Sequence, residues 1–158
     1  MAFRVVIKLG GGLITDKSSM KKFNRKAVDE VVDSLCSVSN LGASIVLVHG
    51  AGSYGHLLAK EYEIASGLKL DKEVEQWAAV EEIRSDMREL NALIIGRMNE
   101  RGLECSFHPP SDWATGTGAD FSGDVSHFER GADEPIPITF GDVVDTDDET
   151  KFGILSGD

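Results

Sequence analysis

The chain has 158 residues, of which 41% are hydrophobic and 27% charged, a composition typical of one globular domain with its own hydrophobic core. The formal net charge of −11 argues against a nucleic-acid partner, because phosphate backbones are bound by electropositive surfaces. The first apolar run, Phe3 to Leu9, is too short for a signal-peptide core or a bilayer span, so we expect a cytoplasmic protein without a membrane partner.

Basic residues are concentrated near the N-terminus. Residues 1–26 carry a net charge of +6, whereas the rest of the chain carries −17. Four of the basic residues stand at the start of a predicted helix, where a solvated surface is the usual role. These four are Lys21, Lys22, Arg25 and Lys26. We therefore consider only Lys8 and Lys17 as ligands of phosphate.

The two cysteines, Cys36 and Cys105, lack the close spacing of a metal site such as CxxC. Two cysteines also cannot cross-link a chain of this size into a disulfide framework. We expect both to be buried, reduced thiols, and we assign no metal ligand to the protein itself.

The first third of the chain predicts a strand, a helix and a second strand. Phe3 to Leu9 is rich in β-branched residues and runs into three glycines, Gly10 to Gly12, as a buried strand does before a tight turn. Asn24 can cap a helix that ends near residues 40–42, and Ser44 to His49 is a second buried strand. This order predicts a parallel pair of strands joined by a right-handed crossover.

Two helices are predicted in the middle of the chain. A short one begins after Gly55 and ends near Tyr62. A long one covers roughly Lys72 to Arg101, because apolar residues recur there at helical spacing and Gly102 can end it. An apolar stripe of this kind is typical of a core or a subunit interface.

The last third predicts short strands separated by loops. Leu103 to His108 reads as a strand, and Ser111 to Gly131 as a loop with room for a short helix. Pro137 to Phe140 and Phe152 to Leu155 are predicted as strands that flank a hairpin, joined by the acidic turn Asp145 to Glu149.

A glycine-rich turn follows each of the first two predicted strands. The turns lie in Lys8 to Gly12 and in His49 to His56. The carboxyl ends of neighbouring parallel strands meet at one edge of a sheet, where open α/β sheets bind ligands. Glycine lets backbone N–H groups approach phosphate oxygens closely, and a following helix adds its dipole. Two such turns can hold two phosphates.

Three side chains beside these turns could carry phosphoryl transfer, which needs positive charge on the oxygens of the transition state. Lys8 ends the first strand, Lys17 lies on the loop that would fold back over the site, and His56 could donate a hydrogen bond to an acceptor phosphate. Alone, each has a structural alternative: a strand lysine extending to solvent, an exposed lysine, or a histidine that caps a helix. Their joint placement at two glycine turns favours a site.

A dinucleotide site is the alternative for the second turn. Gly50 to Gly55 fits GxGxxG, and Asp71 stands at about the distance expected for a ribose contact. That fingerprint requires a strand before the acidic residue, whereas residues 56–72 contain no strand-like run. It also leaves Lys8 and the first turn unexplained, so we discount it. The P-loop pattern GxxxxGK[ST] does not occur.

Four blocks of sequence resemble, in order, the motifs of the amino acid kinase superfamily, and within it the isopentenyl phosphate kinase family. The blocks are KLGGGLITDK ending at Lys17, HGAGSYGH ending at His56, FGDVV ending at Val144 and GILSGD ending at Asp158. The resemblance implies an α/β fold, a three-layer αβα sandwich with a mainly parallel central sheet. Fosfomycin kinases are similar enough to remain a competing assignment.

The resemblance also implies roles for individual residues. ATP phosphates would be contacted by Lys8, Gly10, Gly11, Gly12 and Gly52. The phosphorylated substrate would be contacted by Ala51, Gly55, His56 and Gly157, with Ala51 and Gly52 at the junction of the two substrates. Lys17 would stabilise the transferring group, and Asp158 would hold the lysines in position. The sequence departs from the family where Gly12 replaces a frequent serine and Ala51 a frequent glycine.

The implied reaction converts isopentenyl phosphate to isopentenyl diphosphate with Mg²⁺ and ATP, in a homodimer. Family members continue well beyond the SGD block, so we expect residues 1–158 to be the N-terminal, phosphate-acceptor part of a longer enzyme that lacks its nucleotide-binding part here. The isolated chain should then be inactive as a kinase. A hypothesis from another class is a module that binds a phosphate ligand without catalysis.

Overall fold

The computed structural model describes residues 3–157, and its centre is a parallel sheet. The strand order is β1-β2-β6-β3, with β1 at Arg4–Leu9, β2 at Ser44–His49, β6 at Ile136–Phe140 and β3 at Cys105–Phe107. All three strand pairs in this sheet are parallel. The predicted α/β class with a mainly parallel central sheet is therefore confirmed.

The strand, helix, strand unit forms as predicted. After β1 come the short helix α1 (Gly11–Ile14) and the longer α2 (Arg25–Asn40). The side chain of Asn24 accepts a hydrogen bond from the N–H of Ala27, which confirms it as the helix cap. β2 then pairs with β1 over the full length of both strands, so the two glycine turns leave the sheet side by side.

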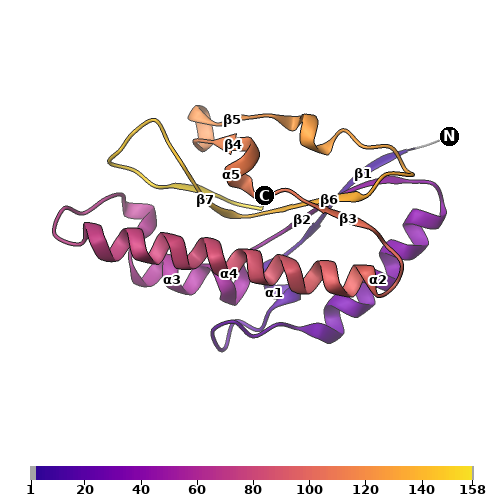
Figure 1. Cartoon of the computed structure of the whole chain (residues 1–158). Helices are drawn as coiled ribbons and strands as arrows, with labels where there is room; N and C mark the ends of the chain where they lie inside the picture. Colours follow the sequence, from indigo (N-terminus) through magenta and orange to yellow (C-terminus); the bar gives the residue numbers. More distant parts are fainter. Residues whose placement is uncertain (1–2, 158) are drawn as a thin grey trace.

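Helices cover one face of the sheet. The short α3 (His56–Glu61) and the long α4 (Glu73–Asn99) follow β2 and confirm both predicted helices. Figure 1 shows α1 to α4 on one side of the sheet, and α5 (Pro110–Trp113) with the small β4–β5 pair on the other. The apolar stripe of α4 lies in the main hydrophobic core, as its spacing indicated. Its buried apolar members are Ala79, Val80, Ile83, Met87, Leu90, Ile94 and Met98.

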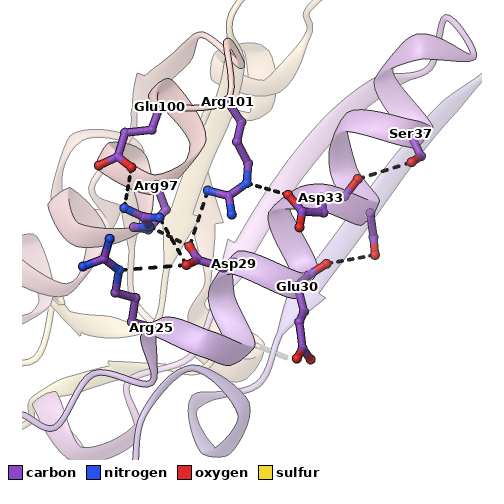
Figure 2. A network of polar contacts seen from close by, with 9 residues as sticks. Arg25, Asp29, Glu30, Asp33, Ser37, Arg97, Glu100 and Arg101 are labelled. Carbon is purple, nitrogen blue, oxygen red and sulfur yellow. Dashed lines mark hydrogen bonds and ion pairs between the residues drawn. The ribbon is translucent and has the colours of Figure 1, made fainter.

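Charged side chains fasten α2 to the C-terminal end of α4 (Figure 2). The guanidinium of Arg97 donates to both carboxylate oxygens of Asp29, from Nε at 2.6 Å and from Nη2 at 3.1 Å. Arg101 lies 3.5 Å from the same carboxylate. The hydrogen bond from Arg97 is the main reason why the pKa of Asp29 lies below its usual value. The pairing helps to fix α4, which supplies one wall of the site below.

The C-terminal hairpin differs from the predicted one. Pro137 to Phe140 is a strand, but as part of β6 it lies between β2 and β3 in the parallel sheet. The hairpin is formed by β7 (Asp142–Val144) and β8 (Gly153–Leu155), which pair antiparallel. The prediction of Pro137 to Phe140 as a flank of the hairpin was therefore wrong. An uninterrupted buried strand belongs in a covered parallel sheet.

The segment predicted as a loop carries several short elements. Besides α5 it contains β4 (Ala114–Thr115), β5 (Ser122–Gly123) and single 3-10 turns, of which the last is Val125–Phe128. Both cysteines are free, but each is only partly buried. No helix among the described residues combines the length and apolar character that a bilayer crossing needs.

Candidate active site

The two glycine turns pack directly against each other. A Cβ on Gly11 would lie 2.3 Å from the backbone nitrogen of Gly52, and one on Gly50 would lie 2.7 Å from the nitrogen of Gly11. Real Cβ atoms are not found at such distances from backbone atoms, so only glycine fits at these positions. The glycines are thus required for the contact between the turns, in addition to any close approach of a ligand.

A buried threonine hydroxyl ties the turns together. Thr15 Oγ1 donates to the carbonyl of Gly11 at 2.7 Å and accepts from the N–H of Ser53 at 3.0 Å. Only 2% of the Thr15 residue is exposed. Its hydroxyl lies so close to Gly52 that a Cβ there would be 2.0 Å away. Sequence reasoning gave Thr15 no role of its own, although it stands inside the first motif block.

A cleft of about 330 Å³ opens beside the turns. The predicted site residues that line it are Lys8, Gly10, Gly11, Gly12, Lys17, Ala51, Gly55, His56 and Gly157. Side chains and backbone from three distant segments are thus brought to one place. Gly52 does not line the cleft, because it is buried against Gly11 and Thr15. Asp158 lies outside the described residues.

The polar end of the cleft is positively charged. The Lys17 ammonium lies beside the first turn, since a Cβ on Gly12 would be 3.8 Å from Lys17 Nζ. Burial, and after it the charge of Lys17, lower the pKa of His56. The imidazole is therefore neutral at pH 7 and offers one N–H donor. Lys8 reaches the same cleft from the end of β1. Lys8, Lys17 and His56 therefore all line the same cleft.

Backbone donors add to this end of the cleft. The N–H groups of Gly11 and Gly12 form the first turn of α1 and donate to no acceptor among residues 3–157. A Cβ on Gly10 would meet no atom within 4 Å, so the space in front of this turn is open. Unpaired N–H groups next to this open space and to lysines fit the phosphate groups of a nucleotide or a monoester.

Another part of the cleft lining is apolar. Its walls come from α3, from α4 and from the β7–β8 hairpin. The residues are Ala59, Ile83, Met87, Val143, Ile154 and Leu155. Sequence reasoning interpreted the apolar stripe of α4 as core or subunit interface, and it assigned the hairpin no part in the site. The helical spacing of Ile83 and Met87 predicts only that both side chains face inward. It does not distinguish a core residue from a pocket residue, because both face inward.

A buried carboxylate in the cleft lining was also missed. Asp142 is 5% exposed, and its Oδ1 accepts a hydrogen bond from the N–H of Val143. Its other oxygen, Oδ2, is buried and has no hydrogen-bond partner among the described residues. Burial raises the pKa of Asp142 to about 6. The sequence signal was the aspartate of the FGDVV block, which was quoted without a role.

The structure removes the basis for the dinucleotide alternative. Residues 56–72 contain α3 and a 3-10 turn at Ile64–Ser66, and no strand. Asp71 lies in a turn before α4 rather than at the end of a strand. The four basic residues near α2 behave as expected of a surface: Lys22 pairs with Asp16, and Lys21 with carboxylates of α4.

These features define an α/β unit with two glycine turns at one edge of its parallel sheet, and the chain belongs to the amino acid kinase family, whose sequence profile matches residues 3–158. It is similar to isopentenyl phosphate kinase of Thermoplasma acidophilum, with 30% identity over 154 residues that make up 98% of this chain and 58% of that protein. The enzyme of the same name from Methanothermobacter thermautotrophicus is 29% identical, over 98% of this chain and 59% of the relative.

Solved structures give the same result. An X-ray structure of isopentenyl phosphate kinase superposes with a TM-score of 0.82 at 27% identity, covering 99% of this chain and 64% of the other. The product complex of the T. acidophilum enzyme superposes with a TM-score of 0.77 at 28% identity, covering 99% and 61%. The chain spans about 60% of the length of the curated relatives it matches.

Proposed function

We propose that this chain supplies the acceptor side of an ATP-dependent phosphotransferase whose substrate is a small phosphate monoester, with isopentenyl phosphate as the first candidate. The observation that carries the proposal is the cleft lined by Lys8, Lys17 and His56, by two glycine turns and by apolar side chains. The similarity to isopentenyl phosphate kinases supports the same substrate class.

In this proposal the acceptor phosphate lies between the two turns. His56, neutral at pH 7, donates its N–H to a phosphate oxygen of the acceptor. An oxygen of that phosphate attacks the γ-phosphorus of ATP, the bond to the β-phosphate oxygen breaks, and ADP leaves. The Lys17 ammonium offsets the negative charge on the transferring group, which is where such reactions need it most.

The donor phosphates are assigned to the first turn. Lys8 and the N–H groups of Gly10, Gly11 and Gly12 would contact them, because these groups border the open space of the cleft. Mg²⁺ would be held mainly by phosphate oxygens and water, and would neutralise the charge on the phosphates. Gly52 would contribute by fixing the turns, and Asp158 by holding the lysines. We also propose that the protein is a cytoplasmic homodimer. The homodimer is implied by the family resemblance, and the location by the sequence.

The apolar end would select the organic part of the acceptor. A cleft of about 330 Å³ is small, and much of it is taken by the phosphates, so a short branched hydrocarbon suits the remaining space. Ile83, Val143 and Ile154 would contact that group. A phosphate whose organic group is large or charged would not make these apolar contacts.

The proposal is tested with an acceptor screen on the gene product carrying whatever sequence follows residue 158. We expect isopentenyl phosphate to be turned over, and fosfomycin or uridylate to be poor acceptors. Lys17→Met should lower kcat about 100-fold or more with a small change in KM, since the charge acts in the transition state. Lys22→Met, on the same loop but paired with Asp16, is the control.

The 158-residue chain alone should bind isopentenyl phosphate without turnover, and His56→Ala should weaken that binding about tenfold. Turnover by the isolated chain would refute the expectation that the nucleotide-binding part lies elsewhere. Binding with no turnover in the extended protein would favour the non-catalytic module instead.

A further inference from the structure

His49 is a fully buried polar side chain at the end of β2, and none of the roles above uses it. Its residue is 0% exposed, and its ring stacks on Phe140 with the centroids 5.1 Å apart. Burial lowers the pKa of His49 to about 4, so the ring is neutral at pH 7. A neutral imidazole has one donor nitrogen and one acceptor nitrogen, and its neighbours decide which is which.

The contact with Gly50 indicates one tautomer. Nδ1 lies 2.9 Å from the carbonyl oxygen of Gly50, which can only accept, so a neutral ring bonded there carries its hydrogen on Nδ1. Nε2 is then an acceptor, and it lies 3.2 Å from Oδ1 of the buried Asn91 on α4, which is also an acceptor. The two side chains can bond only if the Asn91 amide is rotated by a half-turn, which places its NH₂ group at Nε2, and we assign the amide in that orientation.

The bond to the Gly50 carbonyl fixes a peptide plane in the second glycine turn. In a trans peptide the carbonyl and the following N–H point in opposite directions. With the Gly50 carbonyl held against the buried ring, the N–H of Ala51 points away from it. Ala51 lines the cleft, and its N–H donates to no acceptor among residues 3–157.

We propose that His49 is a positioning residue whose Nδ1–H, kept in that tautomer by Asn91, turns the Gly50–Ala51 peptide so that the Ala51 N–H faces the bound phosphate. The inference rests on the proposed function, because it needs a phosphate in the cleft. The consequence is a chain of contacts from α4 through β2 to the turn. The orientation of the donor then depends on a ring that never touches the substrate.

The test compares two variants that remove the same ring. In His49→Asn the amide nitrogen can take the place of Nδ1 and still donate to Gly50. In His49→Gln the longer side chain carries its amide to the place of Nε2, near Asn91 and away from Gly50. Both lose the stacking on Phe140, so a difference between them reports the donor and not the packing. The probe is inorganic phosphate, titrated into ¹⁵N-labelled chain at pH 7.

In the wild-type chain the ¹⁵N spectrum should show His49 as the Nδ1–H tautomer. His49→Asn should keep the residual dipolar coupling of the Ala51 N–H and bind phosphate within about threefold of wild type. His49→Gln should change the coupling and weaken phosphate binding about tenfold, because the Ala51 N–H would no longer point at the anion and its hydrogen bond would be lost. An Nε2–H tautomer, or equal behaviour of the two variants, would overturn the proposal.

The dipolar coupling is measured without ligand, and this separates the two hypotheses. A wild-type chain that binds no phosphate contradicts the proposed function, whereas the coupling still decides whether His49 sets the peptide plane. Should both variants fail to fold, the tautomer in the wild-type chain decides the matter alone.

Discussion

Gly11 and Gly52 belong to different turns, yet their backbones touch so closely that neither position leaves room for a methyl group. The contact sets the spacing of the two turns and therefore the width of the polar end of the cleft. It gives the glycines a structural role that can be separated experimentally from their approach to a ligand.

We expect Gly52→Ala and Gly10→Ala to affect different properties. Gly52 has a φ of +52°, and its Cβ would lie 2.0 Å from Thr15 Oγ1, so Gly52→Ala should lower the free energy of unfolding by about 2 kcal/mol or more. Gly10 has a φ of −61° and open space around its Cβ, so Gly10→Ala should leave stability unchanged or slightly raised. Urea denaturation measures both.

Phosphate binding should be weakened more by Gly10→Ala than by Gly52→Ala. Gly10→Ala places a methyl group at the mouth of the cleft and should weaken phosphate binding in a protein of normal stability. Equal unfolding free energies for the two variants would show that the close contact between the turns is not maintained in solution.

The hydroxyl of Thr15 should matter more than its size. Thr15→Val keeps the volume but leaves the buried N–H of Ser53 without its acceptor, at a cost of roughly 1–3 kcal/mol in the free energy of unfolding. Thr115→Val, an equal change at an exposed position, is the control and should shift stability by no more than about 0.5 kcal/mol. Thermal or urea unfolding of both variants checks this. Equal changes in the free energy of unfolding for the two variants would rule out the bridging role of Thr15.

The charge of Lys17 should be visible in the titration of His56. Burial is the larger cause of the lowered pKa of His56, and the Lys17 ammonium is the second. Lys17→Met removes only the second cause, so the pKa should rise part of the way toward its usual value. Lys22→Met changes the same charge on the same loop, but Lys22 is bound to Asp16 and should leave the titration of His56 unaltered. The ring proton resonances of His56 between pH 4 and 8 give the measurement.

Asp142 should make the stability of the chain depend on pH. Its pKa is raised from 3.8 to about 6 in the folded state, so the native protein binds the proton more tightly than the unfolded chain. This contribution to stability is complete below pH 4 and is lost as the pH rises through 6. Relative to wild type, Asp142→Asn should therefore gain stability between pH 4 and 7, by up to about 3 kcal/mol.

Chemical denaturation of both proteins across that range checks the sign. Asp147→Asn removes an exposed carboxylate from the same hairpin and serves as the control. A difference between Asp142→Asn and wild type that stays constant with pH would mean that this carboxylate is solvated in the folded protein.

The fold class and the polar half of the site follow from local signals in the amino-acid sequence. β1 and β2 are short, β-branched and followed by glycines, and these are local signals that neighbouring strands do not change. Lys8, Lys17 and His56 could be named because each is fixed in sequence relative to a glycine turn. The rule that parallel strands end at one edge of a sheet was sufficient to bring them together.

The apolar half of the site and the buried contacts that support it depend on how distant elements pack together. Val143 and Ile154 reach the cleft because β7 pairs with β8 and not with β6. That pairing depends on the position of β6 inside the parallel sheet. Asn91 meets His49 because α4 crosses β2, and no spacing in the sequence encodes that contact. Local patterns follow from each residue's own neighbours along the chain, whereas these contacts depend on how whole elements pack.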